Sequence, residues 1–262
     1  MGTELAVKAC GTPEMMQAAK THSISALDTA SSSSMRNIKW AILGRDRSLP
    51  HLGRKFYHFL MGMGCFALYA FFLSREESLL ALVTIGGALI AVDFFRLRYS
   101  AVNRVALRLF GKLMRREELK SFSGNSFYVL GMVTVVLFFP KTIVLLSVLF
   151  LAIGDPSAAV FGTLYGKHRL IGKKSLEGGL ANFLFTAIAS VLFGSLYLGM
   201  DGHSEAGGWT WIPGHQMWIL GLIGGTVSFI AELFPAPIDD NFSIPVLSAI
   251  LLSIVQGFFP IF

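Results

Sequence analysis

The chain has 262 residues, of which 53% are hydrophobic and 15% are charged, whereas an ordinary globular protein has roughly 25% charged residues. Together with a mean hydropathy of +0.62, this composition excludes a soluble globular protein and predicts an all-α, polytopic integral membrane protein. The net charge of +6 does not predict nucleic acid as a partner, because basic residues in a membrane protein first report its orientation and its contacts with anionic headgroups. Cys10 and Cys65 form no CxxC pair and no Cys/His cluster, so neither a zinc site nor a disulfide framework is expected.

The amino-terminal segment differs in composition from the rest of the chain. It is polar, and it contains four consecutive serines at 31–34. It lacks the basic start and the apolar run of roughly 7–15 residues that a signal peptide needs. We expect residues 1–50 to be a mostly disordered cytosolic tail and residues 51–262 to form one transmembrane domain.

Seven stretches come close to the roughly twenty apolar residues that cross about 30 Å of hydrocarbon as a helix. They cover residues 56–73, 79–95, 122–139, 142–161, 180–198, 217–234 and 244–262. The stretch at 122–139 is the weakest, because it begins with the polar sequence Ser123-Gly124-Asn125-Ser126.

Lysine and arginine are unevenly distributed among the connections. Of the 22 Lys and Arg residues, 20 lie in the amino-terminal segment and in the connections after the second and fourth stretches. The other connections contain only Arg75 and Lys141. Because basic residues stay on the cytoplasmic side, seven spans place the amino terminus inside and the carboxyl terminus outside. The Trp-containing loop at 201–211 is then also outside.

The connection after the second stretch has a helical pattern of its own. Its apolar residues recur with the period of a helix, and its basic residues occupy the other faces. The apolar set is Val102, Val105, Ala106, Leu109, Phe110 and Leu113, and the basic set is Arg104, Arg108, Lys112, Arg115 and Arg116. This pattern is typical of an amphipathic helix in the inner-leaflet interface, with its basic side toward anionic lipids. An amphipathic connector packed on other helices has the same pattern.

Three acidic residues, Asp93, Asp155 and Glu232, fall within or at the ends of apolar stretches. A charge at the centre of a lone transmembrane helix costs about 2.5–3.5 kcal/mol, so such residues usually belong to functional sites or buried pairs. For Asp93, a structural pair with Arg96 one turn later is the alternative to a functional role. For Glu232, the alternative is a hydrogen bond between helices.

Asp155 is followed by Pro156, which is expected to kink or break the helix and to free backbone carbonyls that line a cavity. The segment 162–179, rich in glycine and basic residues, comes next. Glycines permit close approach of the backbone to phosphates, and basic and hydroxyl side chains supply further contacts. These side chains belong to Lys167, Arg169, Lys173, Lys174 and Ser175. The segment has no Walker motif, and a basic loop that only fixes the topology is the alternative.

Two further clusters lie next to predicted spans. Asp239, Asp240 and Asn241 stand between prolines and form an oxygen-rich group that suits magnesium with phosphate, although the same residues suit a turn. At the entrance to the first span, Arg54 and His58 share a helical face. They either line a site or extend toward lipid headgroups.

Taken together, these motifs resemble the family of CTP-dependent lipid kinases, which includes dolichol kinase, phytol kinase and the bacterial and yeast-type diacylglycerol or polyprenol kinases. The resemblance runs from about Gly53 to the carboxyl terminus. Its most specific pieces are RKxxH at 54–58, GDPSAAxxG at 154–162, YGKHRLIGKKSLEGG at 165–179 and ExxxxxxDDNxxIP at 232–245. The sequence is also similar to phosphatidate cytidylyltransferase, but the KD, PGHGG and RxD elements that close that enzyme are absent.

The resemblance implies transfer of the γ-phosphoryl group of CTP, or of another nucleoside triphosphate, to the hydroxyl of a membrane lipid alcohol at the cytosolic face. It implies Mg²⁺ bound by Asp155, Asp239, Asp240 and Glu232. The catalytic residues would be Asp155, Asp239, Asp240 and Lys174, with one carboxylate receiving the hydroxyl proton. The nucleotide-binding residues would be Lys167, Arg169, Lys173, Ser175, Glu177, Gly178, Arg54, Lys55, His58 and Asn241.

Two other functions fit some of the same features. Cytidylyl transfer to phosphatidate is the enzymatic alternative, and a small transporter is the other, since intramembrane carboxylates and broken helices also occur in carriers. No paired repeat supports a carrier. The sequence leaves open the lipid alcohol (diacylglycerol, polyprenol, dolichol or phytol), the choice between CTP and ATP, and whether the chain forms a homo-oligomer.

Overall fold

The computed structural model describes residues 49–111, 114, 117–172, 174–198, 214–235 and 238–258. Nearly all of the expected tail at 1–50, the expected outer loop at 201–211 and Lys173 therefore lie outside the described residues.

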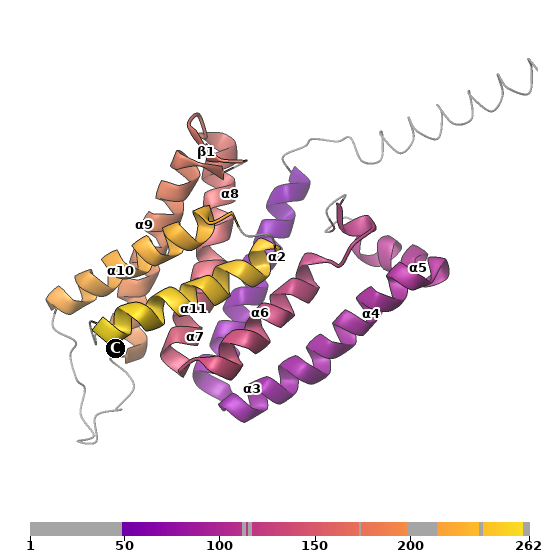
Figure 1. The fold of residues 1–262 in the computed structure, drawn as a ribbon, viewed down its shortest axis with the longest axis horizontal. Coiled ribbons are helices and arrows are strands. Elements are labelled where there is room, and N and C mark those ends of the chain that lie inside the picture. Colours follow the sequence, from indigo (N-terminus) through magenta and orange to yellow (C-terminus); the bar gives the residue numbers. More distant parts are fainter. Residues whose placement is uncertain are drawn as a thin grey trace, which may run out of the picture. The chain divides into compact units, whose positions relative to one another are not determined.

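Helices make up most of the described chain (Figure 1). The α-helices are α2 (Leu49–Ala67), α3 (Arg75–Ala81), α4 (Gly87–Arg98), α5 (Ser100–Phe110), α6 (Gly124–Phe138), α7 (Lys141–Leu149), α8 (Asp155–Leu164), α9 (Leu176–Phe193), α10 (Gly214–Leu233) and α11 (Asp240–Phe258). Four π-helical turns continue or join them, namely η1 (Leu68–Phe72), η2 (Leu82–Gly86), η4 (Phe150–Gly154) and η5 (Gly194–Leu198). A short 3-10 helix, η3 (Glu117–Leu119), and an antiparallel hairpin of β1 (Arg169–Ile171) and β2 (Lys174–Ser175) complete the described elements.

The prediction of an all-α membrane protein is confirmed. Among the described residues, five helical segments are long and apolar enough to cross a membrane, namely Arg75–Arg98, Lys141–Leu164, Leu176–Tyr197, Gln216–Leu233 and Asp240–Phe258. The expected first span lies in α2 and η1, which are not among these five. The expected third span is α6, whose 15 residues cover only about 22 Å at 1.5 Å per residue. The number of spans therefore stays a prediction.

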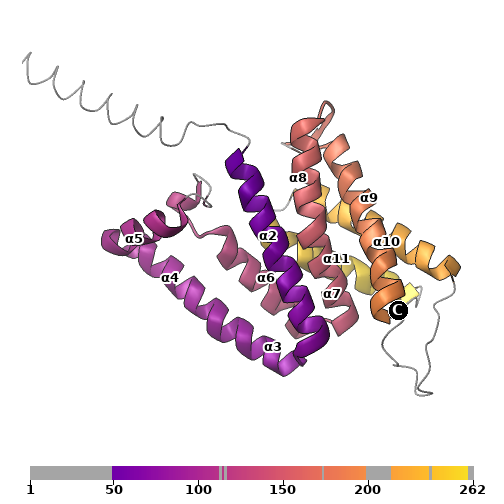
Figure 2. The same ribbon diagram turned by 180° about the vertical axis from the view of Figure 1, so that it is seen from behind.

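The segment Lys141–Leu164 is the centre of the fold. Of the most apolar 18 residues in Lys141–Leu164, 72% are buried, whereas the value for Arg75–Arg98 is 17%. Lys141–Leu164 is therefore surrounded by other helices, and Arg75–Arg98 is peripheral. Its α7 and η4 contribute fully buried side chains such as Val144, Leu145 and Phe150. Around it, α9 packs closely on α8 and α10, and α11 packs on α6 and α7. Figures 1 and 2 show α8, α9 and α10 on one side of α2 and α6, and α3, α4 and α5 on the other.

The expected break at Pro156 does not occur. The helix runs on from α7 through η4 into α8, with Pro156 in the first turn of α8. In a regular α-helix, the proline ring clashes with a backbone carbonyl of the preceding turn. A π turn contains one extra residue, so a different carbonyl lies opposite the ring. The Ser157 hydroxyl also donates to the Gly154 carbonyl at 2.8 Å. The proline is therefore accommodated by a wide turn directly before Asp155.

The two basic residues of the predicted outer connections lie at one end of the bundle. Arg75 donates to the Leu137 carbonyl at the end of α6, and Lys141 donates to the Ala70 carbonyl in η1 at 3.1 Å. The starts of α2 and α6 lie at the opposite end, together with the hairpin. This separation fits the uneven distribution of basic residues in the sequence.

The connection between α4 and α6 is fixed by a buried ion pair. Asp93 accepts from Arg96, from the Ser126 hydroxyl at 2.7 Å and from the Ser123 amide at 2.6 Å. Arg96 in turn donates to the Glu118 and Ser121 carbonyls, at 2.9 and 2.7 Å. The structural pair considered from the sequence is thus present. The expected amphipathic helix is α5, whose place in the interface stays a prediction.

We expect Asp93→Asn to destabilise the fold, because it leaves the Arg96 guanidinium buried without its carboxylate. Removing one member of a buried pair costs about 3–5 kcal/mol. The melting temperature in detergent should therefore fall by several degrees, measured by tryptophan fluorescence or light scattering. Glu76→Gln changes an exposed carboxylate at the opposite end and should leave the melting temperature unchanged. Equal melting temperatures for the two variants would contradict this role of Asp93.

Candidate active site

A cavity of about 680 Å³ lies at the hairpin end of the bundle, and its volume is within the range of small-molecule sites. Its walls come from six parts of the chain: the start of α2, α8, the hairpin, the start of α9, the end of α10 and the start of α11. The lining residues are Lys55, Asp155, Ala158, Ala159, Gly162, Thr163, Arg169, Gly172, Lys174, Ser175, Gly178, Gly179, Glu232, Leu233 and Asp240. Motifs separated by 185 residues in sequence therefore meet at one place.

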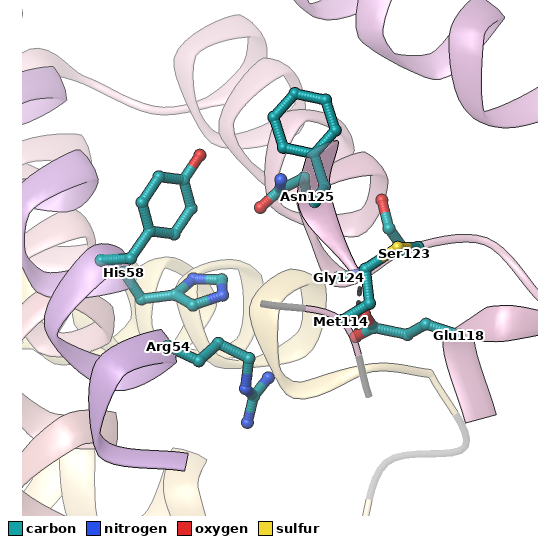
Figure 3. A pocket seen from close by; sticks show the side chains of 9 residues that line it. Arg54, His58, Met114, Glu118, Ser123, Gly124 and Asn125 are labelled. Carbon is teal, nitrogen blue, oxygen red and sulfur yellow. Dashed lines mark hydrogen bonds between the residues drawn. The ribbon is translucent and has the colours of Figure 1, made fainter. Parts of the chain in front are cut away.

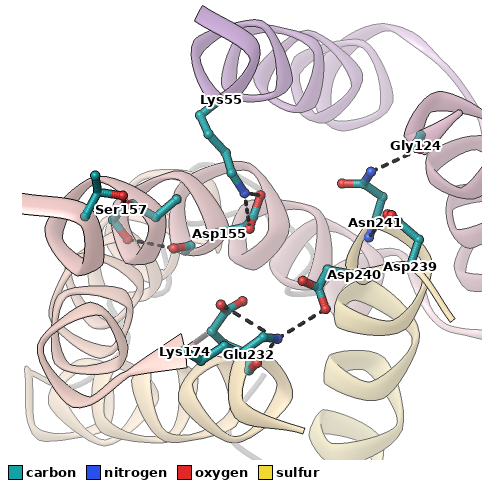
Figure 4. Close-up of polar contacts among 12 residues, drawn as sticks. Lys55, Gly124, Asp155, Ser157, Lys174, Glu232, Asp239, Asp240 and Asn241 are labelled. Carbon is teal, nitrogen blue, oxygen red and sulfur yellow. Dashed lines mark hydrogen bonds and ion pairs between the residues drawn. The ribbon is translucent and has the colours of Figure 1, made fainter. Parts of the chain in front are cut away.

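Lys55 and Asp155 form an ion pair on one wall (Figure 4). The Lys55 ammonium group donates to both oxygens of the carboxylate, and the two side chains are only 12% and 8% exposed. Asp155 is the first residue after the π turn, which fixes the point at which its side chain leaves the helix. An unpaired charge that is buried to this extent would destabilise the fold, so each residue of the pair offsets the cost of burying the other.

The opposite wall is formed by the hairpin. Gly172 makes its turn possible, with a φ of 55° that side chains rarely allow. On β2, Lys174 donates to the Glu232 carbonyl and to the Asp240 carboxylate at 3.2 Å. This lysine joins the hairpin to the end of α10 and the start of α11, as Figure 4 shows.

The start of α9 also lies on the cavity. Ser175 caps this helix, and its hydroxyl accepts from the Gly178 amide at 3.2 Å. Gly178 and Gly179 both line the cavity, and they allow close packing, since a Cβ atom would lie 2.7 Å from the Ala158 carbonyl oxygen at Gly178 and 2.6 Å from the Phe229 ring at Gly179. The first amides of a helix, together with its dipole, attract anions. Lys174 and Arg169 line the same region and carry positive charge.

Glu232 is the third carboxylate on the cavity. Its side chain is 8% exposed, and Oε1 lies 3.8 Å from the Lys174 ammonium group. Its Oε2 is buried and has no hydrogen-bond partner within the described part of the chain. The hydrogen bond between helices that the sequence suggested for Glu232 is therefore not formed by Oε2 within the described residues. Glu232 therefore lines the cavity with one oxygen near Lys174 and the other buried.

Several predicted site residues support the walls without lining the cavity. Asp239 directly precedes α11, and its side chain accepts from the Asn241 backbone amide at 3.0 Å. Asn241 is buried and donates to the Gly124 carbonyl at 3.1 Å, which fastens α11 to α6. Glu177 accepts from the His168 amide and pairs with its ring at 2.8 Å, which closes the hairpin. Lys167 is exposed and does not line the cavity.

Arg54 and His58 line a second, smaller cavity of about 70 Å³ between α2 and the start of α6 (Figure 3). Both side chains are buried, at 8% and 6% exposed, so they do not extend toward headgroups. Glu118 lies opposite them and accepts from the Gly124 amide at 3.2 Å. Glu118 is not among the site residues expected from the sequence, although a glutamate four residues before an apolar stretch is a signal that could have identified it.

No protein-family model matches the chain, and no solved structure matches it. Curated relatives do match, and three of them share one name. The chain is 32% identical to a CTP-dependent diacylglycerol kinase 1 of Eremothecium gossypii, over 78% of this chain and 67% of the relative. It is 30% identical to the Saccharomyces cerevisiae protein of that name, over 77% of this chain and 72% of the relative. It is 32% identical to the Schizosaccharomyces pombe protein, over 63% of this chain and 74% of the relative.

The chain belongs to the CTP-dependent lipid kinase family. Membership decides against a carrier as the main function. Within the described residues, the 680 Å³ cavity combines a volume suitable for a small molecule with both signs of charge, which makes it the candidate active site.

The Lys55–Asp155 pair permits a test that separates stability from activity. Lys55→Met and Asp155→Asn should each lower the melting temperature, because each leaves one buried charge unpaired. The double variant should recover most of that loss, since both charges are gone. Lipid phosphorylation should be lost in all three, if the charges also serve the reaction.

The matched control is Lys120→Met, which removes an exposed lysine outside the cavity and should change neither property. An active double variant would mean that the pair is only structural. A double variant as unstable as the single ones would contradict the pairing itself.

Proposed function

We propose that this lipid kinase transfers the γ-phosphoryl group of CTP to the hydroxyl of diacylglycerol in the 680 Å³ cavity. The observation that carries the proposal is the cavity's composition. Three basic side chains, three carboxylates and the start of α9 line one cavity, and Lys55 and Lys174 each lie next to a carboxylate. Phosphoryl transfer needs this combination, because its catalysis consists mainly of positioning and charge neutralisation.

The triphosphate belongs on the hairpin side. Lys174 and Arg169 supply positive charge there, and the dipole at the start of α9 favours an anion. The contact between Glu177 and His168 holds the hairpin to the start of α9. Lys167, which is exposed, and Lys173, which lies outside the described residues, are further candidates for phosphate contacts.

The carboxylates fit a magnesium ion held together with the nucleotide. Mg²⁺ is usually bound by one or two carboxylates, phosphate oxygens and water rather than by a closed protein cage. This matches the described residues, in which no group of three or more His, Cys, Asp and Glu is close enough to hold a metal alone. Asp240, Glu232 and Asp155 line the cavity and are the residues that would hold it. A bound ion would neutralise charge on the transferring phosphoryl group.

In the reaction, the lipid hydroxyl oxygen bonds to the γ-phosphorus while the bond from that phosphorus to the bridging oxygen of CTP breaks. CDP leaves, and the hydroxyl proton passes to a carboxylate of the cavity. Lys55 holds Asp155 in place through both carboxylate oxygens. Lys174 lies next to Asp240 and Glu232, where it neutralises phosphate and carboxylate charge together.

Diacylglycerol is the proposed acceptor because the three relatives are named for it. We further propose that the cavity faces the cytosol and that the amino terminus is inside, on the basis of the Lys and Arg distribution. Arg104 and Arg108 on α5 are exposed, which supports contact of this helix with anionic lipids.

The function is tested with purified protein, Mg²⁺, CTP and a panel of diacylglycerol, polyprenol, dolichol and phytol. We expect label from [γ-³²P]CTP in phosphatidate, and no lipid label from [α-³²P]CTP. Label from the α position in a liponucleotide would instead show cytidylyl transfer. Parallel reactions with γ-labelled ATP measure the selectivity for the nucleotide, and omission of Mg²⁺ should abolish the product.

The orientation is tested by accessibility of single cysteines in a variant without Cys10 and Cys65. Leu170→Cys lies in β1, where the native side chain is 45% exposed, and should react with a membrane-impermeant maleimide only from the cytosolic side. Glu76→Cys is exposed at the other end and should react only from outside. Reaction of both from the same side would contradict the proposed topology.

A further inference from the structure

A polar cavity and an apolar groove follow one another along the same pair of helices, α2 and α6. The polar part is the 70 Å³ cavity with Arg54, His58, Glu118 and Asn125. The apolar part is a groove of about 190 Å³ between α2, α6 and the helix formed by α3, η2 and α4. Its walls are Met61, Cys65, Leu68, Tyr69, Leu73, Ser78, Ala81, Leu82, Ile85, Gly86, Leu89, Tyr128, Val129, Met132 and Val136. We call the two parts together the α2–α6 seam.

Helical spacing aligns the polar cavity and the apolar groove along the same helix faces. Positions 54, 58, 61 and 65 of α2 and position 68 of η1 are separated by three or four residues and therefore follow one face. On α6, the positions 125, 128, 132 and 136 do the same. The rings of His58 and Tyr128 lie 6.2 Å apart, where the polar part meets the apolar part. One end of the seam is thus charged and the rest is apolar.

The apolar part has the dimensions of a lipid chain. From Met61 to Leu73, twelve residues of helix at 1.5 Å each cover about 18 Å, which is more than half of the roughly 30 Å hydrocarbon core. The floor is buried, with Met132 at 3% and Val136 at 1% exposed. The rim is open, with Leu68 at 51% and Ile85 at 67% exposed. Such a groove can be entered sideways from the bilayer.

The groove is formed by irregular backbone on both sides. The π turns η1 and η2 both contribute lining residues. Within η2, Gly86 lies so close to α6 that a Cβ atom there would be 2.3 Å from Cγ1 of Val129. This contact draws the two helices together at one point, and the wide turns displace neighbouring side chains. Single π turns inside α-helices often mark functional sites.

We propose that the α2–α6 seam binds the diacylglycerol acceptor, with one acyl chain in the apolar groove and the glycerol ester region in the polar cavity. This inference rests on the proposed function. The polarity matches such an amphiphile, since the charged side chains are at the end of the seam near the active site and the groove is lined mainly by apolar side chains. Arg54 lies in the seam and its neighbour Lys55 lies in the active-site cavity, so the acceptor is bound beside the turn of α2 that carries Lys55.

Photolabelling tests occupancy without requiring turnover. Protein in phosphatidylcholine micelles is irradiated with a diacylglycerol that carries a diazirine in one acyl chain, and labelled peptides are identified by mass spectrometry. We expect label on α2 between Met61 and Leu73 and on α6 between Tyr128 and Val136. Unlabelled diacylglycerol should remove the label, whereas extra phosphatidylcholine should not. Equal competition by both lipids would mean that bulk lipid fills the groove, and would overturn the proposal.

Filling the groove tests its role in the reaction. Ala81→Trp places a large side chain in the groove, and Ala88→Trp places the same side chain at an exposed position of α4 outside it. For Ala81→Trp we expect the KM for dioleoylglycerol to rise about ten-fold, within the range by which an apolar pocket discriminates. The KM for CTP and the activity on dihexanoylglycerol should change less than about two-fold. Ala88→Trp should resemble the wild type throughout.

The outcomes separate the two proposals. If the wild type phosphorylates no diacylglycerol but the photolabel still maps to the seam and competes with diacylglycerol, the binding site stands and the proposed function fails. If the wild type is active and Ala81→Trp affects long and short substrates equally, the seam is not the acceptor site and the proposed function stands. A general loss of activity with a lowered melting temperature is resolved by Ala81→Leu, which fills less of the groove and should give a smaller rise of the same KM.

Discussion

The ion pair between Lys55 and Asp155 is the interaction on which the site depends. It joins the first helix of the bundle to the central one, and both side chains are almost completely buried. A carboxylate at this burial is costly when it is alone, so its position requires the lysine. Because the pair takes both carboxylate oxygens, it also fixes the direction of Asp155 toward the cavity. The pair therefore stabilises the fold at the candidate site, and only a double substitution can separate this effect from the proposed role in the reaction.

Partly or fully buried ion pairs also connect separate elements at two other places. Lys174 balances Asp240 and Glu232 and holds the hairpin against α10 and α11. Asp93 and Arg96 balance one another and hold the segment from Glu118 to Ser126, which forms the polar part of the α2–α6 seam. In each case a charged group that would be costly in an apolar environment connects elements from distant parts of the sequence. The end of the bundle that carries the hairpin and the cavity is thus stabilised by ion pairs, and the remainder by apolar packing.

The arrangement also accounts for how a water-soluble donor and a membrane-bound acceptor could meet. The active-site cavity lies between α8, the hairpin, α9, α10 and the starts of α2 and α11. The seam lies on the other side of α2, where the helix faces α6 and α3 to α4. α2 separates the two and contributes Lys55 to one and Arg54 to the other. A single helix could thereby bring both substrates to the same level of the membrane.

The sequence by itself determined the class of fold and much of the site. The composition required a helical membrane protein. Asp155, Lys174, Glu232 and Asp240 could be identified because charged residues within or beside apolar stretches are costly and usually belong to sites or buried pairs. It could not decide that Pro156 is absorbed by a π turn, because the choice between a break and a wide turn depends on how the central helix packs. Nor could it separate Asp155 and Lys174, which line the cavity, from Asp239 and Glu177, which hold its walls in place. Such roles depend on which groups from distant segments come within hydrogen-bonding distance, and only the tertiary structure brings those segments together.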